Sequence, residues 1–493
     1  MHCNDPLLFA AAIRSSESQP AYGHLIANQW VSSDALLPVT APATGQRFAW
    51  LARGNKQAVD DAVKAARAAL GGKWGQMTAA ERGRLMLRYS ALVLSHAERL
   101  AWIEAHDTGK PISQARADMQ AVARYFEFYG GGADKIHGEV IPYLNGYSVT
   151  VVREPLGVTA HITPWNYPAQ MFGRTLAPAL AMGNATVLKP AEEACLVCLE
   201  LGFLAVEAGF PPGALNIVTG VGEEAGAALA AHAEINFISF TGSPEVGRLI
   251  QEAAAINHIP VVLELGGKSP QIVFADADLN AAATTVCKAI TQNAGQTCSA
   301  GSRVIVERSI FDRFMKLVGE KFNALRIGAP EDDADLGPVI NATQQRRIQD
   351  FMDIARRDDV PMLAQKQLAG DSQGYFVAPT VFGPLERNHP LVCQEIFGPV
   401  LAAQVFDTED EAVALANGTE FGLVAGVWTR DGARQQRMAK RIVSGQVFIN
   451  CYGAGGGVEL PFGGTKHSGH GREKGFRALE EVSTTKTIVN YYG

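Results

Sequence analysis

From about residue 149 the chain alternates short runs rich in β-branched residues with segments of helical spacing, and this rhythm restricts the folds open to it. The expected strands are 149–155, 157–164, 184–190, 214–220, 235–242 and 260–267. Such alternation indicates βαβ units and a doubly wound parallel sheet, whose ligands bind beyond the carboxyl ends of the strands. The residues that follow each run are therefore the first candidates for a functional site.

A second alternating region follows Gly266 and indicates a second α/β domain, which holds the loop 293–302. A chain of 493 residues is too long for a single core, so two or three domains are expected. The tail 481–493 is rich in Thr, Val and Tyr, and we expect it to form a strand between subunits rather than a free end.

The overall charge and hydropathy exclude several classes of partner. A net charge of −7, with no run of Lys and Arg, argues against nucleic acid or an anionic membrane surface. No stretch approaches the ~20 apolar residues that span a bilayer, and no Lys or Arg precedes the apolar run 7–13. We therefore expect a cytoplasmic protein.

The cysteines are scattered and odd in number, which does not indicate a disulfide framework. Cys195 and Cys198 form a lone CxxC in a stretch of helical spacing, where core packing is the interpretation and metal or redox work the alternative. No second pair or nearby His completes a tetrahedral site, so we expect no metal.

Cys298 stands apart, in the small and polar sequence NAGQTCSAGS. A structural cysteine behaves as a small hydrophobe among apolar neighbours, whereas a reactive thiol needs access, backbone N–H donors and a lowered pKa. The surroundings of Cys298 favour the second kind.

Two polar residues at strand ends are candidates for chemistry. Asn166, in ITPWNYP, is either a turn residue or a preorganised donor to a developing oxyanion. Glu264 ends an apolar run before two glycines, where burial raises a carboxyl pKa toward that of a general base. A structural Glu in a salt bridge is the alternative.

Three further motifs suit a dinucleotide. In LKPAEE, Lys189 can donate to ribose or phosphate, and the carboxylate of Glu192 can accept from ribose while repelling the extra phosphate of NADP. Ser243 begins a helix whose free N–H groups favour pyrophosphate, although a plain helix start is the alternative. In QEIFGPV, Glu395 can hold the second ribose and Phe397 can pack on a nicotinamide.

In this order and spacing, ITPWNYP, LKPAEE, FTGSPEVG, ELGGKSP, GQTCSA, QEIFGPV and PFGGTKHSGHGRE closely resemble the aldehyde dehydrogenase superfamily, over nearly the whole chain from about residue 25. The resemblance implies an NAD-binding domain of residues 1–129 and 149–262 and a catalytic domain of residues 263–463. It also implies a small β oligomerisation arm of residues 130–148 and 475–493, in a homodimer or homotetramer.

The resemblance further implies NAD-dependent oxidation of a small-molecule aldehyde to its acid. The Cys298 thiolate would attack the aldehyde, Asn166 would hold the oxyanion, and Glu264 would activate water against the thioester, as in the hydrolytic branch rather than the CoA-acylating one. The implied cofactor contacts are Ile162, Trp165, Lys189, Glu192, Gly222, Gly226, Gly242, Ser243, Leu265, Glu395 and Phe397. Glu473 matches a carboxylate that some members use for proton relay, and NADP is less expected than NAD.

The chain departs from the family pattern around the expected substrate tunnel. Arg174 stands where many relatives carry Trp, Thr291 and Gln292 stand where aromatics are common, and glycines fill 455–457. We interpret these changes as a wider, more polar tunnel, in which Arg174 pairs a substrate carboxylate or stacks on a ring. The alternative is that Arg174 points away into a structural salt bridge. The expected substrate residues are Tyr167, Arg174, Gln292, Thr297 and Phe462.

The corresponding substrate is an aromatic or heteroaromatic aldehyde with oxygen substituents, or a carboxylated semialdehyde. Betaine-aldehyde-like and broad aliphatic activity are the alternatives. A cysteine esterase or acyltransferase has no use for Lys189, Glu192, Ser243 or Glu395, and a binding protein without catalysis predicts a damaged site.

Overall fold

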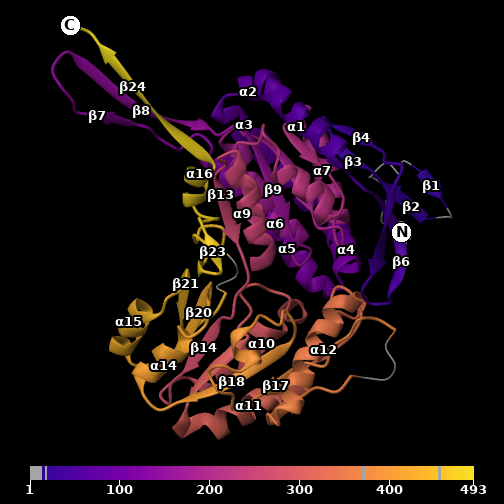
Figure 1. Ribbon diagram of the computed structural model, residues 1–493, viewed down its shortest axis with the longest axis vertical. Coiled ribbons are helices and arrows are strands. Elements are labelled where there is room, and N and C mark those ends of the chain that lie inside the picture. Colours follow the sequence, from indigo (N-terminus) through magenta and orange to yellow (C-terminus); the bar gives the residue numbers. More distant parts are fainter. Residues whose placement is uncertain (1–13, 17–18, 369–372, 454–456) are drawn as a thin grey trace.

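The computed structural model describes residues 14–16, 19–368, 373–453 and 457–493, so the apolar run 7–13 and Gly455 and Gly456 lie outside the described residues. Two α/β bodies lie one above the other in Figure 1, and an arm of strands projects from the upper body. Cys195 and Cys198 are both fully buried in the core of the first body, which fits the packing interpretation.

The first body contains an eight-stranded sheet in the order β23-β13-β12-β9-β10-β11-β3-β4. Its strands are β3 (His24–Ile26), β4 (Gln29–Val31), β9 (Val158–Thr163), β10 (Ala185–Pro190), β11 (Leu215–Ile217), β12 (Phe237–Thr241), β13 (Val261–Glu264) and β23 (Gly469–His470). Strands β9 to β13 are mutually parallel, and the order reverses between β9 and β12. The expected doubly wound sheet is confirmed, and its switch point lies between these two strands.

Helices cover this sheet because β9, β10 and β12 are buried at every position and so need apolar cover on both faces. The longer helices are α1 (Lys56–Gly71), α3 (Ala79–Ser95), α4 (Ala97–Thr108), α5 (Ile112–Gly132), α6 (Pro168–Ala181), α7 (Leu196–Ala208) and α9 (Pro244–Ile256). Asn55 caps α1 by accepting from two backbone N–H groups, which fixes the start of this helix.

The second body contains a seven-stranded sheet in the order β16-β17-β18-β15-β14-β20-β21. Its strands are β14 (Pro270–Val273), β15 (Arg303–Glu307), β16 (Met362–Gln365), β17 (Thr380–Phe382), β18 (Val400–Phe406), β20 (Val424–Trp428) and β21 (Gln446–Ile449). The accompanying helices are α10 (Leu279–Thr291), α11 (Phe311–Ala324), α12 (Ala342–Arg357), α14 (Glu409–Ala416) and α15 (Gly432–Arg441). All neighbouring strands are parallel except β16 and β17, which confirms the expected second α/β unit.

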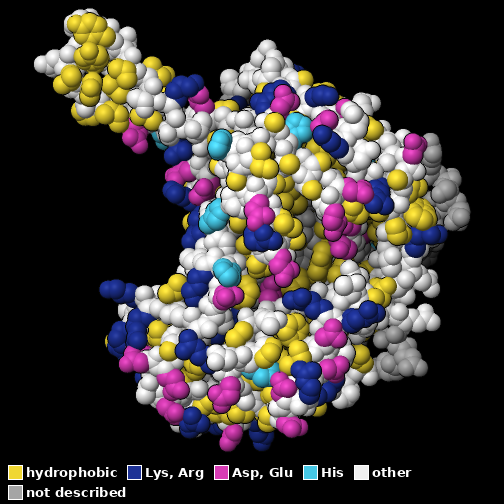
Figure 2. Space-filling model, viewed as in Figure 1, with side chains coloured by type: hydrophobic (Ala, Val, Ile, Leu, Met, Phe, Trp, Pro, Cys, Tyr) yellow, Lys and Arg dark blue, Asp and Glu magenta, His cyan; other side chains and the backbone are white. Residues whose placement is uncertain are grey.

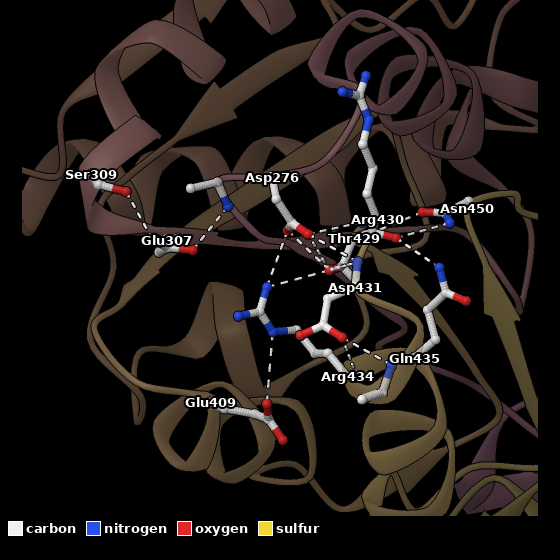
Figure 3. Close-up of polar contacts among 12 residues, drawn as sticks. Asp276, Glu307, Ser309, Glu409, Thr429, Arg430, Asp431, Arg434, Gln435 and Asn450 are labelled. Atoms are coloured by element: carbon white, nitrogen blue, oxygen red, sulfur yellow. Dashed lines mark hydrogen bonds and ion pairs between the residues drawn. The ribbon is translucent and has the colours of Figure 1, made fainter.

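The second sheet reverses its order between β14 and β20, and the chain's own side chains fill the carboxyl end of that reversal (Figure 3). Both oxygens of Asp276 accept from the Thr429 hydroxyl at 2.9 Å, and one also accepts from the N–H groups of Arg430 and Asp431 at 3.0 Å. Arg434 pairs with the same carboxylate at 3.1 Å. Asp276 and Thr429 are therefore bonded to neighbouring groups of the same chain at this end of the sheet.

The arm is an antiparallel sheet of β7 (Glu139–Ile141), β8 (Tyr147–Pro155) and β24 (Ser483–Tyr491), in the order β24-β8-β7. The prediction that 149–155 joins the parallel sheet is therefore wrong. Strands of a covered parallel sheet are buried on both faces, whereas only Val149 of β8 is buried. The tail forms β24 and pairs with β8 of its own chain, and Figure 2 shows hydrophobic side chains gathered toward the tip of the arm.

Smaller elements complete the described chain. A four-stranded sheet contains β1 (Arg14–Ser16), β2 (Gln19–Tyr22), β5 (Leu36–Ala41) and β6 (Gln46–Ala52), and β19 (Phe421–Gly422) pairs with β22 (Thr465–Lys466). The short helices are α2 (Lys73–Gln76), α8 (Ala227–Ala230), α13 (Pro390–Cys393) and α16 (Arg477–Glu481). Within the residues described, none of the helices combines the length and the apolarity needed to cross a membrane.

Candidate active site

The carboxyl edge of the first sheet meets a loop of the second body. Asn166 follows β9, Ser243 follows β12, and Glu264 is the last residue of β13. Cys298 lies in the loop before β15, at the amino end of the second sheet. The switch point of one sheet thus faces the thiol loop that leads into the other.

Two glycines after β13 let other segments approach closely. A Cβ at Gly267 would lie 2.3 Å from the carbonyl oxygen of Cys298, and one at Gly266 would lie 2.3 Å from a carboxylate oxygen of Glu395. The N–H of Gly267 donates to the other oxygen of Glu395 at 2.9 Å. The ELGGKSP motif therefore brings Glu264, the thiol loop and Glu395 together with no side chain between them.

Asn166 is tied to the thiol loop. Its side-chain nitrogen donates to the carbonyl of Gln296 at 2.8 Å, two residues before Cys298. The side chain of Asn293 donates in turn to the carbonyl of Asn166 at 2.9 Å, so that both segments are held. Because an amide carries two N–H donors, Asn166 keeps one for another acceptor.

The thiol of Cys298 has a raised pKa, not the lowered one that its sequence context predicts. Burial raises the pKa to about 11, and the nearby positive charge of Arg174 offsets only part of this rise. A thiolate is favoured when cations outweigh the cost of burial, whereas here Arg174 is shared with two carboxylates. Cys298 therefore needs a base to accept its proton.

Arg174 lies on α6 and joins Glu264 to Glu473. One guanidinium nitrogen lies 3.4 Å from Glu264, and another forms a close ion pair with Glu473. All three side chains are buried. Burial and the charge of Glu473 raise the pKa of Glu264 to about 8 against the pull of Arg174, which agrees with the rise that its position at a strand end predicts.

A cavity of about 110 Å³ opens onto Cys298. Besides Cys298, its aromatic, polar and charged lining includes Tyr167, Gln170, Arg174, Thr297, Phe448, Tyr452, Phe462 and Lys474. The hydroxyl groups of Tyr167 and Thr297 lie 2.9 Å apart. Four of the expected substrate residues thus share one cavity with the thiol.

Gln292 is the expected substrate residue that does not line this cavity. It borders a separate hollow with Gln114 and Lys288, because the chain turns sharply after α10 through Asn293 and Ala294, both at positive φ. Sequence reasoning also missed Lys474. The sequence around Lys474 has no distinguishing pattern, and its position next to Glu473 is the one signal that could have indicated it.

The expected cofactor contacts occupy the carboxyl ends of β10 and β12. Lys189 is the second-last residue of β10, and its ammonium donates to the carboxylate of Glu192 at 2.8 Å. Gly222 and Gly226 bound a turn of π-helix, and a Cβ at Gly226 would only just reach the Lys189 chain, at 4.0 Å. The absence of a side chain at Gly226 thus leaves open space beside Lys189.

Ser243 caps α9 and leaves the first turn of that helix next to the switch point. Its hydroxyl accepts from the N–H of Val246 at 3.3 Å, and Gly242 donates its N–H to the carbonyl of Glu264 at 3.1 Å. Leu265 packs where Gly247 has no side chain, since a Cβ there would lie 2.6 Å from it. The helix terminus is thereby held close to β13, and because Pro244 has no N–H and Val246 donates to Ser243, the N–H of Glu245 is the one that this turn can offer a ligand.

The remaining expected contacts lie across the two bodies. Trp165 and Phe397 meet edge to face with ring centroids 5.4 Å apart, and Ile162 is buried near the end of β9. Burial raises the pKa of Glu395 to about 7, although its bond from Gly267 favours the charged form.

The chain is similar in sequence and in structure to known aldehyde dehydrogenases. The chain is 43% identical to human retinal dehydrogenase 2 over 474 residues, which covers 94% of this chain and 90% of that protein. A Burkholderia cenocepacia structure, named as a candidate aldehyde dehydrogenase, superposes with a TM-score of 0.94 at 58% identity, covering 96% of this chain and 100% of its own. Betaine aldehyde dehydrogenase from Staphylococcus aureus, solved with NAD⁺, gives 0.93 at 35% identity, covering 96% and 95%.

A doubly wound sheet whose ligand edge faces a loop from a second α/β unit defines an α/β protein of the dinucleotide-binding class. Residues 30–488 match the model of the aldehyde dehydrogenase family, and the chain belongs to that family. The expected resemblance and enzyme class, an oxidoreductase acting on aldehydes, are confirmed.

Proposed function

We propose that the protein oxidises an aldehyde to its carboxylic acid with NAD, through a thiohemiacetal and then a thioester on Cys298. The observation that carries the proposal is that Asn166 and the residues directly after Glu264 both contact the loop of Cys298, whose thiol lines the cavity. The same arrangement supports the hydrolytic branch, because Glu264 is present and buried beside the thiol loop.

Attack begins at the sulfur of Cys298. The thiol passes its proton to the carboxylate of Glu264, which returns it to solvent before the thioester is hydrolysed. The sulfur bonds to the aldehyde carbon, and the carbonyl oxygen becomes an oxyanion. The second N–H of Asn166 and the backbone N–H of Cys298 are the donors to that oxyanion. Because Asn166 is already fixed by its bond to Gln296, little reorganisation accompanies the reaction.

The described residues fit a dinucleotide. The ammonium of Lys189, the N–H of Glu245 at the start of α9 and the buried carboxylate of Glu395 offer two donors and an acceptor to a dinucleotide. When bound, NAD supplies a nicotinamide that accepts the hydride of the thiohemiacetal carbon. Glu192 favours NAD over NADP, because its carboxylate repels the additional phosphate.

Glu264 releases the product. As a carboxylate it accepts a proton from water, the water oxygen bonds to the thioester carbon, and the carbon–sulfur bond breaks to leave the acid and the Cys298 thiolate. A pKa near 8 makes Glu264 basic enough for this step in neutral to mildly alkaline solution.

The cavity lining supports an aromatic or heteroaromatic aldehyde bearing oxygen or carboxylate substituents. Tyr167, Phe448, Tyr452 and Phe462 offer ring surfaces, and Lys474, whose pKa is lowered to about 7 by burial and by Arg174, is a cation below about pH 7. A trimethylammonium aldehyde is the alternative that the Staphylococcus aureus relative suggests, but the protonated lysine repels a quaternary ammonium. Replacing Lys474 by Met should raise KM for a carboxylated aromatic aldehyde and leave the uncharged aldehyde of the same ring nearly unchanged.

A second copy of the chain is the expected partner of the arm. Strand β24 has an open edge within the described chain, and Ile488, Val489 and Tyr491 are exposed along it. On the body, Leu249 and Ile256 of α9 are exposed as well. Exposed apolar edges of this length are costly in a lone protein, so pairing between copies is favoured. Sedimentation analysis of Val489→Glu beside the unaltered protein should show smaller assemblies.

NADH formation by the purified protein tests the main proposal. Aliphatic, aromatic, carboxylated and trimethylammonio aldehydes are each supplied with NAD and with NADP, and Cys298→Ala serves as the control. NAD-dependent turnover that is lost in Cys298→Ala supports the proposal. Ester hydrolysis without oxidation of any aldehyde would instead support a cysteine esterase.

A further inference from the structure

Arg174 is held so that little of its charge is left for a substrate. Its guanidinium lies 4.4 Å over the ring of Phe462, with ion pairs to Glu264 and Glu473 at its edges. Only 4% of the residue is exposed. A substrate carboxylate would have to compete with two buried carboxylates for the same cation.

Glu473 is itself anchored on the first sheet. Its carboxylate accepts from the hydroxyl of Ser239 on β12 at 3.0 Å, and Ser239 accepts from Thr175 of α6 at 3.0 Å. The backbone of Glu473 exchanges two hydrogen bonds with Phe462, at 2.7 and 2.8 Å. Arg174 is therefore fixed by groups that belong to the scaffold.

Glu264 depends on Arg174 for its place. Within the described chain, neither carboxylate oxygen of Glu264 accepts a hydrogen bond, although both are fully buried. A buried carboxylate without hydrogen bonds is expensive unless a cation compensates it, and the pair with Arg174 at 3.4 Å supplies that compensation. Gly463 leaves room for the carboxylate, because a Cβ there would lie 2.7 Å from one of its oxygens.

We propose that Arg174 is a positioning residue for Glu264, holding its carboxylate at the thiol loop, and does not clamp the substrate. The proposal rests on the function proposed above, in which Glu264 is the base that activates water. Arg174 lines the cavity, as the first sequence-based interpretation expects, and its charge is paired with Glu264 and Glu473, as the salt-bridge alternative expects.

The charged groups around Glu264 determine the sign of the effect. Arg174 on α6, Arg472 and Lys474 on the segment after β23 all favour the ionised form, whereas Glu473 opposes it. The thiol of Cys298 faces the same cluster. Removing the charge of Arg174 therefore shifts the titration of Glu264 to higher pH.

The test compares Arg174→Gln with the conservative Arg174→Lys. For Arg174→Gln we expect a NADH burst of wild-type amplitude, followed by a steady-state rate about tenfold lower near neutral pH, with its acidic limb moved upward by about one pH unit. Arg174→Lys should restore most of the rate and the position of the limb. The loss should be equal for an uncharged and a carboxylated aromatic aldehyde.

A limb that does not move, or a loss confined to the carboxylated aldehyde, would overturn the proposal. An infrared titration of the protonated carboxyl band, assigned by its disappearance in Glu264→Gln, gives a second readout that needs no turnover. Its midpoint should be higher in Arg174→Gln than in the unaltered protein, and equal midpoints refute the positioning role. Absence of aldehyde oxidation by the unaltered protein would overturn the proposed function alone, while the infrared midpoints would still decide the role of Arg174.

Discussion

Replacing Gly267 by Ala tests whether catalysis depends on the close approach of the thiol loop to the end of β13. The added Cβ would lie 2.3 Å from the Cys298 carbonyl oxygen, where ordinary contact begins at 3.4 Å, so that backbone must move by about 1 Å. A displacement of ~1 Å at a reacting group costs roughly 100-fold in rate, which equals about 2.7 kcal/mol of barrier. We therefore expect kcat to fall by about two orders of magnitude.

Gly266→Ala is the matched comparison, because its Cβ would meet the carboxylate of Glu395, the far end of a side chain that can rotate. That variant should raise KM for NAD and change kcat much less. Gly432→Ala, with no atom within 4 Å of the new Cβ, should behave as the unaltered protein does. Steady-state NADH formation gives both constants, and thermal unfolding checks that each variant is folded. A folded Gly267→Ala with a kcat within about threefold of the original would refute this reasoning.

Three further outcomes are expected. Burial raises the pKa of Glu264 to about 8, and only the ionised carboxylate takes a proton from water. The deacylation rate should therefore fall as the pH drops through about 8. Deacylation rates measured across this range locate the acidic limb of the pH profile, and a limb well below neutral pH contradicts the assignment of Glu264. Changing Glu192 to Gln removes a charge contact of ~1 kcal/mol, so kcat/KM for NADP should rise about fivefold relative to NAD, and an unchanged ratio in paired assays counts against its role. The ammonium of the buried Lys110 lies 2.6 Å from Glu104 and 2.5 Å from Asp118, so Lys110→Met leaves two buried carboxylates without their cation. Urea unfolding should show a free energy of unfolding lower by roughly 3–5 kcal/mol, a loss that the exposed Lys64→Met does not share.

Residues at strand ends were the most predictable part of the site. The carboxyl ends of parallel strands meet at one edge of a sheet, so Asn166 and Glu264 could be expected to lie near each other from the order of the strands alone. The burial of Glu264 and its raised pKa also followed from an apolar run that ends in a carboxylate. These inferences needed only local pattern and the general geometry of a parallel sheet.

Properties set by distant partners could not be predicted in the same way. The pairing of Arg174 depends on Glu473, which lies about 300 residues further along the chain. The pKa of Cys298 is raised chiefly by burial, and the extent of that burial is set by segments distant in the sequence. The β-branched run 149–155 is compatible with a covered strand or an exposed ribbon, and its partner β24 decides the matter. Gln292 lies away from the substrate cavity because the chain turns at Asn293 and Ala294. Both have positive φ, which the sequence does not indicate because neither is a glycine.

The position of strand β23 in the chain has a consequence for folding during synthesis. It pairs with β13 through Leu263 and Glu264, and the residues that follow it supply Glu473 and Lys474 before the chain ends in the arm. A ribosome therefore delivers the thiol of Cys298 long before it delivers the groups that complete its surroundings. Because domains fold as they emerge, both sheets can form around a site that is still open on one side. The segment 469–474 closes that side, so a chain terminated before it would carry Cys298, Arg174 and Glu264 without Glu473 and Lys474.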